Sequence, residues 1–298
     1  MNDISQTSQT SLLSQDLLRR LKERLDIPRD IQPDLEGLRL VYRAWCSSIP
    51  FDNMRKMISL RSGSDAKLAG LDAEDFFENF LANGTGGTCW PSSNALYALV
   101  HDLGFDARRA AGSMFEVPDV NHGTVKVRLD GVDWMVDSSM LTYEPFPVTN
   151  ETYVKTGIHP VETEIYDGFH VFWVDFPPMP EFIPCRMRLD PVDDEFYSER
   201  YEGFSRTQSP FNDKLYFRKG GPDGTTVVFG NTSFKRKGDE LDVLPFDRDG
   251  LCRYLADQMG VSQKLVDDWV ASGSLESTFA ETERPPAPEI TRPRPSRR

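Results

Sequence analysis

Apolar residues recur at helical spacing near the start of the chain. Leu13, Leu17 and Leu21 lie four positions apart, and a second apolar stripe runs from Leu38 to Trp45 ahead of Pro50. Residues so spaced share one face of a helix, which can pack against a core. The pattern therefore predicts two amphipathic helices, the second of them ended by the proline.

Two further helices are predicted from their end signals. Asp72 is a suitable N-cap for an aromatic-rich stretch, and Asn83-Gly84 is a suitable stop. A fourth helix is expected from about Pro91 to Leu103, because proline is tolerated in the first turn and Gly104 follows the last one. The first hundred residues are thus predicted to be helical.

After Phe105 the apolar period changes to two, which predicts strands. The alternating runs Thr124–Leu129 and Val132–Val136 are joined by Asp130-Gly131, a strong hairpin signal. The same reasoning predicts strands at Arg109–Glu116, Phe169–Phe176, Arg186–Leu189, Lys214–Arg218 and Thr225–Phe229, and a helix at Phe246–Gly260.

Composition narrows the class of protein. The chain has 298 residues and a net charge of −13, so nonspecific binding to nucleic acid or to an anionic membrane surface is not expected. It contains no apolar run of about 18 residues that could span a membrane, and its first residues lack the pattern of a secretory signal. The four cysteines lie too far apart in sequence for a zinc or dithiol motif. We therefore expect a cytoplasmic protein with free thiols and no bound metal.

Cys89 is the strongest candidate for a reactive residue. It follows Gly86-Gly87-Thr88 at a predicted helix start, where the helix dipole stabilises a thiolate and glycines let the backbone approach closely. Paired glycines ahead of a helix also leave backbone N–H groups that could hold an oxyanion. A small buried cysteine of the core would fit the same position, so Cys89 needs partners before it indicates catalysis.

The hairpin supplies a candidate base and a candidate orienting acid. His122 lies just before its first strand and Asp137 at the end of its second, so hairpin formation brings the two together. A thiol needs a base to become a thiolate, and the base needs a partner to fix its tautomer. Either residue alone could be structural, and Asp133 is an alternative orienting acid. His101 is expected at the surface, too remote from Cys89 to take its proton.

Together these residues resemble the arylamine N-acetyltransferase family, which shares a papain-like Cys-His-Asp arrangement with the transglutaminase-like superfamily. The segment Ile49–Met54 is similar to the family's Ile-Pro-Phe-Glu-Asn-Leu, and Gly86–Cys89 is similar to its Gly-Gly-x-Cys. His122 and Asp137 fall where the family's histidine and aspartate fall, and Ser209–Arg218 resembles the start of its C-terminal part. The resemblance covers most of the folded body and identifies the chain as a divergent member.

The resemblance implies an α+β, papain-like cysteine fold. Its parts would be a helical N-terminal domain that carries the nucleophile at 11–105, a central β-barrel-like domain at 106–208 and a C-terminal α/β lid at 209–283. The Ser/Thr/Gln-rich start (1–10) and the Pro/Arg-rich tail (284–298) are predicted to be disordered.

The resemblance also implies a reaction and its substrates. Acetyl-coenzyme A would be the acyl donor, and an arylamine or hydrazine would be the acceptor. Cys89 would carry the acetyl group as a thioester, His122 would take the thiol proton, and Asp137 would orient the imidazole.

Further residues would bind the substrates. Phe51 would line the acceptor pocket, next to the Gly86, Gly87 and Thr88 loop. In the lid segment, Arg218 and Lys219 are the cations expected to meet coenzyme A phosphates in an otherwise acidic protein.

Departures from the family's motifs keep other classes open. Thr85 and Pro91 stand where the family has an arginine and a glutamate, and Asp137 is followed by Ser138-Ser139 rather than a glycine-containing run. Alternatives are an amide synthase that releases a carrier-bound acyl chain, a transglutaminase- or protease-like enzyme, and a noncatalytic binding protein. The sequence leaves the acceptor and the oligomeric state open.

Overall fold

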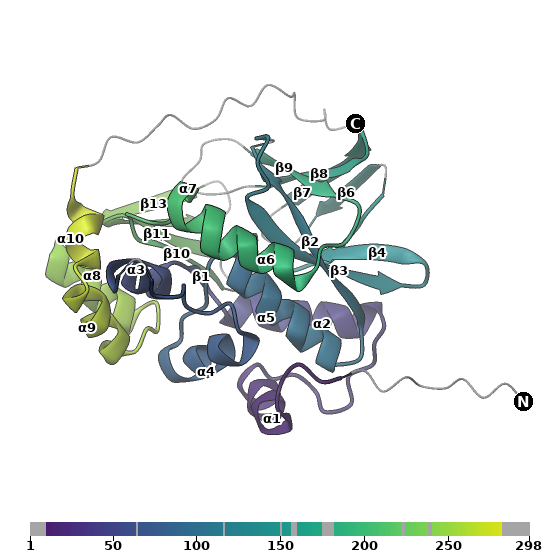
Figure 1. The fold of residues 1–298 in the computed structure, drawn as a ribbon, viewed down its shortest axis with the longest axis horizontal. Helices are drawn as coiled ribbons and strands as arrows, with labels where there is room; N and C mark the ends of the chain where they lie inside the picture. Colours follow the sequence, from purple (N-terminus) through teal and green to yellow (C-terminus); the bar gives the residue numbers. More distant parts are fainter. Residues whose placement is uncertain are drawn as a thin grey trace, which may run out of the picture.

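A computed structural model describes residues 10–63, 65–115, 117–149, 151–155, 160–174, 182–221, 224–237 and 240–281. Helices from the first hundred residues lie against one side of a strongly curved sheet, and a second sheet with three helices lies at the opposite end of the molecule (Figure 1). The predicted combination of helical part, barrel-like sheet and C-terminal α/β part is therefore confirmed.

The aromatic-rich helix begins and ends at the predicted signals. Asp72 accepts a hydrogen bond from Asp75 N at 2.9 Å, and Gly84 ends that helix with a φ of 71°, where glycine is favoured. Trp45 stacks on Phe76, with ring centroids 6.0 Å apart, and joins the helices in one core. The helices are α1 (Gln15–Arg24), α2 (Leu35–Ser48), α3 (Met54–Arg61), α4 (Ala73–Asn83) and α5 (Cys89–Asp102).

The central sheet is antiparallel and has the strand order β5-β4-β3-β2-β9-β8-β7-β6. The predicted hairpin is present, because Asp130 and Gly131 both adopt positive φ between β3 and β4. Met135, Phe146, Phe172, Cys185 and Met187 fill the interior of the curved sheet. The strands are β2 (Asp106–Met114), β3 (His122–Leu129), β4 (Val132–Val136), β5 (Phe146–Pro147), β6 (Glu151–Lys155), β7 (Pro160–Tyr166), β8 (Phe169–Val174) and β9 (Ile183–Arg188).

A helical segment absent from the prediction follows β9. It consists of α6 (Asp194–Glu199), the π-helical turn η1 (Arg200–Phe204) and α7 (Ser205–Gln208), and it runs across α5 (Figure 1). The hydroxyl of Tyr197 reaches the carbonyl oxygens of Ala110 on β2 and Thr124 on β3 at 2.8 and 2.7 Å. These contacts fasten the segment to the sheet.

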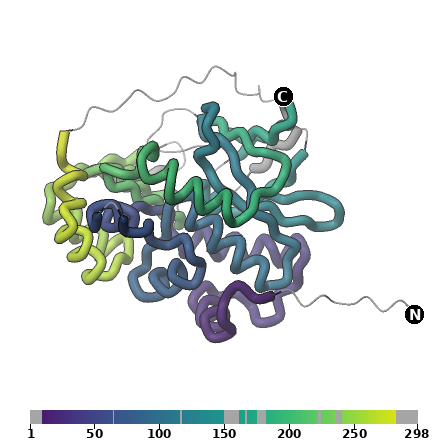
Figure 2. The backbone as a smooth tube through the Cα atoms, viewed as in Figure 1, coloured from purple at the N-terminus to yellow at the C-terminus, as the bar shows by residue number. Residues whose placement is uncertain are grey.

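The C-terminal part is not built from C-terminal residues alone. Its sheet has the order β1-β10-β11-β12-β13, and β1 (Phe51–Asp52) belongs to the first hundred residues. Figure 2 follows this early segment into the C-terminal part, where α3 packs on α9 and α10. The remaining elements are β10 (Tyr216–Gly221), β11 (Gly224–Phe229), β12 (Thr232–Lys237), β13 (Glu240–Pro245), α8 (Arg248–Asp257), α9 (Gln263–Ala271) and α10 (Ser274–Phe279).

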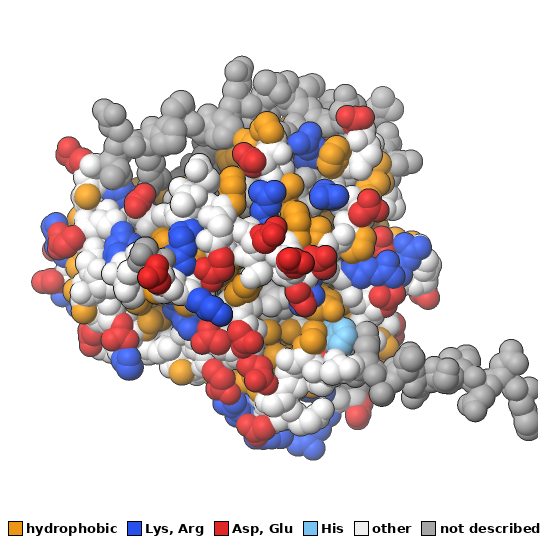
Figure 3. All heavy atoms as spheres, viewed as in Figure 1, with side chains coloured by type: hydrophobic (Ala, Val, Ile, Leu, Met, Phe, Trp, Pro, Cys, Tyr) orange, Lys and Arg blue, Asp and Glu red, His pale blue; other side chains and the backbone are white. Residues whose placement is uncertain are grey.

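The surface carries both signs of charge. On the face in Figure 3, acidic and basic side chains are interspersed over the helices and the sheet. Within the described part of the chain, no helix has the length and apolarity needed to cross a bilayer.

Candidate active site

Cys89 is the first residue of α5, as predicted, and its side chain is 7% exposed. The first N–H groups of a helix have no partner within it, so the positive end of the helix dipole lies at the sulfur. The sulfur is 3.7 Å from the carbonyl oxygen of Asn121, the residue before His122. The helix start thus holds the thiol against the beginning of β3.

The glycine loop before Cys89 is packed against β1. Phe51 pairs with Gly87 in an isolated bridge, and a Cβ atom on Gly86 would lie 2.0 Å from the carbonyl oxygen of Pro50. Gly86 N donates a 2.6 Å hydrogen bond to Asp52 Oδ2. We expected both glycine N–H groups to be free for an oxyanion, and for Gly86 this is wrong, because the Asp52 carboxylate occupies it.

Asp52 is a buried carboxyl group that supports this loop. It is 1% exposed and also accepts a hydrogen bond from Met54 N at 3.0 Å. Burial raises the pKa of Asp52 to about 6, although the two backbone donors and Arg55 act in the opposite direction. The acid–amide pair after Phe51 is therefore a buried support. The Asn53 side chain likewise bonds the carbonyl oxygens of Phe211 and Lys214 at 2.9 and 2.7 Å.

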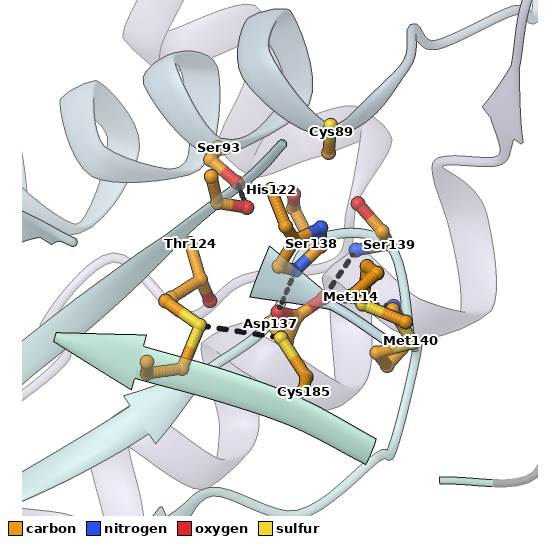
Figure 4. A network of polar contacts seen from close by, with 12 residues as sticks. Cys89, Ser93, Met114, His122, Thr124, Asp137, Ser138, Ser139, Met140 and Cys185 are labelled. Carbon is orange, nitrogen blue, oxygen red and sulfur yellow. Dashed lines mark hydrogen bonds and ion pairs between the residues drawn. The ribbon is translucent and has the colours of Figure 1, made fainter. Parts of the chain in front are cut away.

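His122 and Asp137 form the expected hydrogen-bonded pair. His122 Nε2 lies 2.7 Å from Asp137 Oδ2, and both side chains are buried. In Figure 4, His122 lies between Cys89 and Asp137. Because Nε2 faces the carboxylate, Nδ1 is the imidazole nitrogen left for the thiol.

The loop that carries Asp137 is held from several sides. Asp137 Oδ1 accepts hydrogen bonds from Ser139 N and Met140 N, both at 2.9 Å. The hydroxyl of Tyr42 on α2 donates to Asp137 O at 2.8 Å, and Arg218 Nη2 on β10 donates to Met140 O at 2.8 Å. The residues after Asp137, which include the serines in place of the family's glycine-containing run, thus form a turn whose backbone N–H groups bond the carboxylate.

Charge in the site favours an imidazolium. Burial alone would lower the pKa of His122, but the Asp137 carboxylate and the Cys89 thiol group outweigh burial and raise it to about 10. Burial likewise opposes ionisation of Asp137, yet His122 and the two backbone donors hold its pKa below the usual value. The buried His122 imidazole is therefore favoured in its protonated form.

Ser93 links the nucleophile helix to both partners. Its hydroxyl donates to Gly123 O at 2.7 Å, next to His122, and lies 2.8 Å from Ser138 Oγ, next to Asp137. A Cβ atom on Gly123 would lie 2.7 Å from the Trp90 ring, so this glycine permits the close approach of β3 to α5.

The other residues predicted to bind substrate lie close to this site but are enclosed. Phe51 is 2% exposed and contacts Phe211 and Tyr216 edge-on, with ring centroids 5.2 and 5.6 Å apart. Thr88 is buried at the N-cap of α5. An acceptor could therefore reach Phe51 only by movement of its aromatic neighbours.

The two predicted phosphate contacts have different surroundings. Arg218 is completely buried, and its bond to Met140 O connects β10 with the loop of Asp137. Lys219 is partly exposed, and its Nζ donates to Met259 O at 2.9 Å. The burial of Arg218 argues against direct contact with a phosphate, whereas Lys219 can still reach solvent.

The remaining candidates lie elsewhere. His101 is buried and pairs with Asp102 at 2.8 Å, so its expected surface position is wrong. Asp133, the alternative orienting acid, pairs with Arg128 at 3.0 Å instead of with His122. Burial raises the pKa of the Cys46 thiol to about 12, which makes that cysteine a poor nucleophile. Among the described residues, no group of three or more His, Cys, Asp and Glu side chains could hold a metal ion.

One buried polar residue of α3 was missed by the sequence analysis. Lys56 on α3 is 2% exposed, and its Nζ donates to Ser205 O and Ser205 Oγ at 2.9 and 2.8 Å. Periodicity gave no signal for it, because a lysine in a short mixed helix is normally a solvated residue.

A cysteine at a helix start, next to a histidine–aspartate pair on a barrel-like sheet, is the arrangement of papain-like thiol enzymes. Comparisons with known proteins narrow this class. Residues 34–160 match the family model described as N-acetyltransferase. This match covers 127 of the 298 residues and includes Cys89, His122 and Asp137, so this segment is similar to the N-acetyltransferase family.

Individual relatives agree with this assignment. The chain is 33% identical over 109 residues to proansamycin X synthase of Amycolatopsis mediterranei (strain S699), covering 35% of this chain and 40% of that protein. It is 27% identical over 115 residues to an arylamine N-acetyltransferase of Mycolicibacterium smegmatis, covering 36% and 40%. The chain thus spans about two fifths of the length of the curated relatives it matches.

A solved structure shows the same fold over a longer stretch. The arylamine N-acetyltransferase of Mycobacterium marinum in complex with CoA superposes with a TM-score of 0.74, covering 88% of this chain and 97% of that one at 17% identity. At this identity the likeness establishes the fold.

Proposed function

We propose that this protein is an acyltransferase that carries an acyl group on Cys89 as a thioester and passes it to an amine. The observation that carries the proposal is the placement of Cys89 at the start of α5, beside the buried His122–Asp137 pair. A thiol nucleophile needs a base beside it, and the His122–Asp137 pair would supply that base.

The chemistry follows in two half-reactions. The Cys89 thiolate attacks the donor's carbonyl carbon, a new S–C bond forms, and the donor's thiol or alcohol leaves with a proton from His122. An amine then attacks the thioester, His122 takes the amine's proton, and the C–S bond breaks to regenerate the thiolate. Asp137 keeps the imidazole oriented and stabilises its positive charge in both steps.

The developing oxyanion needs donors other than Gly86. The N–H of Cys89 itself is at the first position of α5, where no carbonyl of the helix can accept from it. We assign it as one oxyanion donor, together with the positive end of the helix dipole. The Gly87–Thr88 backbone would contact the acyl group beside it.

Acetyl-coenzyme A is the donor that the relatives favour, with an arylamine or hydrazine as acceptor. A family model named for N-acetyl transfer matches the segment that contains the nucleophile, and a protein of the same fold has been solved with CoA. Lys219 is the described cation of β10 that could meet a phosphate, while Arg218 would act by supporting the loop of Asp137. The acceptor would approach past Phe51.

An amide synthase is the second candidate. One relative, which is 33% identical, is named as a proansamycin X synthase. Two relatives named as arylamine N-acetyltransferases have lower identities, 27% and 28%. Such an enzyme would use the same Cys89 thioester with a larger acyl chain. A noncatalytic binding protein is disfavoured, because Cys89, His122 and Asp137 are all present and the last two are paired.

Mass spectrometry of the intact protein tests the proposal. After mixing with acetyl-coenzyme A, we expect a mass increase of one acetyl group that is absent in Cys89→Ala and is discharged by an arylamine. Cys46→Ala is the matched control, since its thiol is buried and should remain unmodified. An adduct that maps to Cys46, Cys185 or Cys252 would refute the assignment of the nucleophile.

The same measurement separates the two candidates. Acylation by acyl-pantetheine donors with long chains, but not by acetyl-coenzyme A, would favour the amide synthase. No adduct with either donor, on a folded protein, would favour the noncatalytic alternative.

A further inference from the structure

Ser93 is a buried residue whose hydroxyl joins three segments of the active site. It lies one turn into α5, the helix that begins with the nucleophile, and it is completely buried. Its Oγ donates to Gly123 O at 2.7 Å and lies 2.8 Å from Ser138 Oγ. Gly123 directly follows His122, and Ser138 directly follows Asp137. One side chain on the helix of the nucleophile therefore contacts both the strand of the base and the loop of the acid (Figure 4).

The two serine hydroxyls form a directed chain of hydrogen bonds. Each hydroxyl has one proton to donate. Because Ser93 donates its proton to Gly123 O, the bond between the two hydroxyls is donated by Ser138. We call this set of contacts, from Ser138 through Ser93 to Gly123, the hydroxyl chain. A serine inside a helix often bonds a carbonyl of its own preceding turn, whereas this one bonds residues of other segments.

The hydroxyl chain lies where the backbone pairing of the hairpin ends. The last backbone pair of β3 and β4 is Val125 with Val136, so His122 and Asp137 lie beyond it. On its other side, β3 stays paired with β2 up to His122, which lies opposite Gly112. Beyond the last β3–β4 pair, side-chain contacts have to hold the loop of Asp137 against the strand of His122. The hydroxyl chain does so and anchors both segments on α5.

We propose that Ser93 is a positioning residue of the acyl-transfer site. Its hydroxyl fixes where α5 lies relative to the start of β3 and to the loop of Asp137, and it acts through Gly123 and Ser138 rather than on a substrate. The proposal rests on the function proposed above. A thiol, a base and an orienting acid have to meet at the same time, and a misplacement of about 1 Å can lower the rate about 100-fold.

The residues on either side of Ser93 make contacts of a different kind. Ser92 Oγ donates to Gly87 O at 2.9 Å, in the loop just before the helix. Asn94 Oδ1 accepts from Arg109 Nε at 2.7 Å, which ties the helix to β2. Of these three neighbours, Ser93 is the one that reaches both the residue after the base and the residue after the acid.

The first test needs no substrate. The imidazole of His122 is observed by NMR in the full chain labelled with ¹⁵N-histidine, and its signals are assigned with His122→Gln. In Ser93→Ala, the hydroxyl chain is broken on both sides. We expect the imidazole proton that Nε2 shares with Asp137 to exchange with solvent about tenfold faster than in the wild type. Ser93→Thr keeps a hydroxyl and should restore the wild-type rate.

The second test separates positioning from substrate binding. Loss of a contact that only orients the reacting groups lowers kcat, whereas loss of substrate binding raises KM. With acetyl-coenzyme A as donor and an arylamine as acceptor, we expect kcat of Ser93→Ala to fall about 10- to 100-fold. The KM for the donor should stay within about twofold of the wild-type value.

The C-terminal part of the chain supplies a matched control. Ser272 Oγ donates to Trp269 O at 2.8 Å and lies 2.7 Å from Ser274 Oγ, which is the same arrangement of two hydroxyls and a carbonyl. Ser272→Ala therefore removes equivalent hydrogen bonds at the end of α9. It should leave the solvent exchange of His122 unchanged, whatever it does to the melting temperature.

The outcomes distinguish positioning from general stability. Exchange and kcat of Ser93→Ala within twofold of the wild type would overturn the proposal, and so would equal effects of Ser93→Ala and Ser272→Ala on His122. If the wild type turns over no donor, the proposed function fails, and the exchange measurement still decides the role of Ser93. Should Ser93→Ala fail to fold, Ser138→Ala removes one bond of the hydroxyl chain, and faster exchange of His122 is again the expected result; unchanged exchange would overturn the proposal.

Discussion

Asp52 is the buried acid on which the glycine loop of the nucleophile rests. Its carboxylate accepts hydrogen bonds from Gly86 N and Met54 N, yet the described chain gives it no ion pair. A carboxyl group in this position binds its proton more tightly in the folded chain than in the unfolded one.

Stability should therefore depend on pH through Asp52. The pKa of Asp52 is about 6 in the folded chain, against an ordinary value of 3.8. Its contribution to the free energy of unfolding is therefore complete below pH 3.8 and is lost as the pH rises through 6. Across this interval, the free energy of unfolding of the wild type should fall by about 2 to 3 kcal/mol. That of Asp52→Asn should not show this fall. Urea unfolding at pH 4.5 and 7.5 checks this.

The control for that measurement is Asp133→Asn, which removes a carboxylate paired with Arg128 on the outer part of the hairpin. It should follow the wild type across the whole interval. Equal pH dependence in wild type and Asp52→Asn would show that the carboxyl group is ionised in both states.

The sequence identified those site residues whose signal is local. Cys89 stands at a recognisable helix start, and a two-residue turn fixes how His122 and Asp137 approach each other. Lys56 and the contact between Asp52 and Gly86 depend on residues far apart in the chain. No periodicity reports such contacts, so the local pattern suggested free glycine N–H groups and gave no prediction for Lys56.

Helices and strands were predicted correctly where the sequence marks both of their ends with a cap, a glycine, a proline or a turn. α2, α4 and α5 have caps, glycines or prolines at their ends, and the β3–β4 hairpin has its turn. α3 and the segment from α6 to α7 were missed because their apolar faces are short. Tertiary contacts, such as that of Tyr197 with two strands, hold them in place.

Strand β10 connects the C-terminal sheet to the site through Arg218. Arg218→Met keeps most of the buried volume but leaves Met140 O without its donor, which loosens the turn around Asp137. We expect turnover to fall about 10- to 100-fold and stability to fall by about 1 to 3 kcal/mol. Turnover should be measured with acetyl-coenzyme A and with a phosphate-free aryl ester.

Lys219→Met is the neighbouring control, because its Nζ bonds Met259 O and not the loop of Asp137. A supporting role for Arg218 predicts equal losses with both donors. Loss confined to acetyl-coenzyme A would instead indicate that Arg218 contacts phosphate.

At the scale of the whole molecule, the net charge of −13 opposes an anionic donor. Coenzyme A thioesters should bind faster as salt screens this repulsion, so kcat/KM should rise between about 20 and 200 mM ionic strength. A neutral aryl ester should show no such rise. Lys219→Glu should steepen the dependence for the thioester alone.

The opposite result has a clear meaning as well. If kcat/KM for the thioester falls with salt, local cations around the donor outweigh the global charge. Acidic and basic side chains are interspersed on the face in Figure 3, so the salt dependence of kcat/KM is the measurement that gives the sign of the local field.

The pairing of β1 with β10 sets when the site can be completed during synthesis. Cys89, His122 and Asp137 leave the ribosome early, but Phe51 and Asp52 lack their strand partners Arg218 and Phe217 until β10 follows. A nascent chain therefore holds its cysteine beside a glycine loop that is supported on one side only. The loop before Cys89 therefore reaches its final setting only after most of the chain has been made.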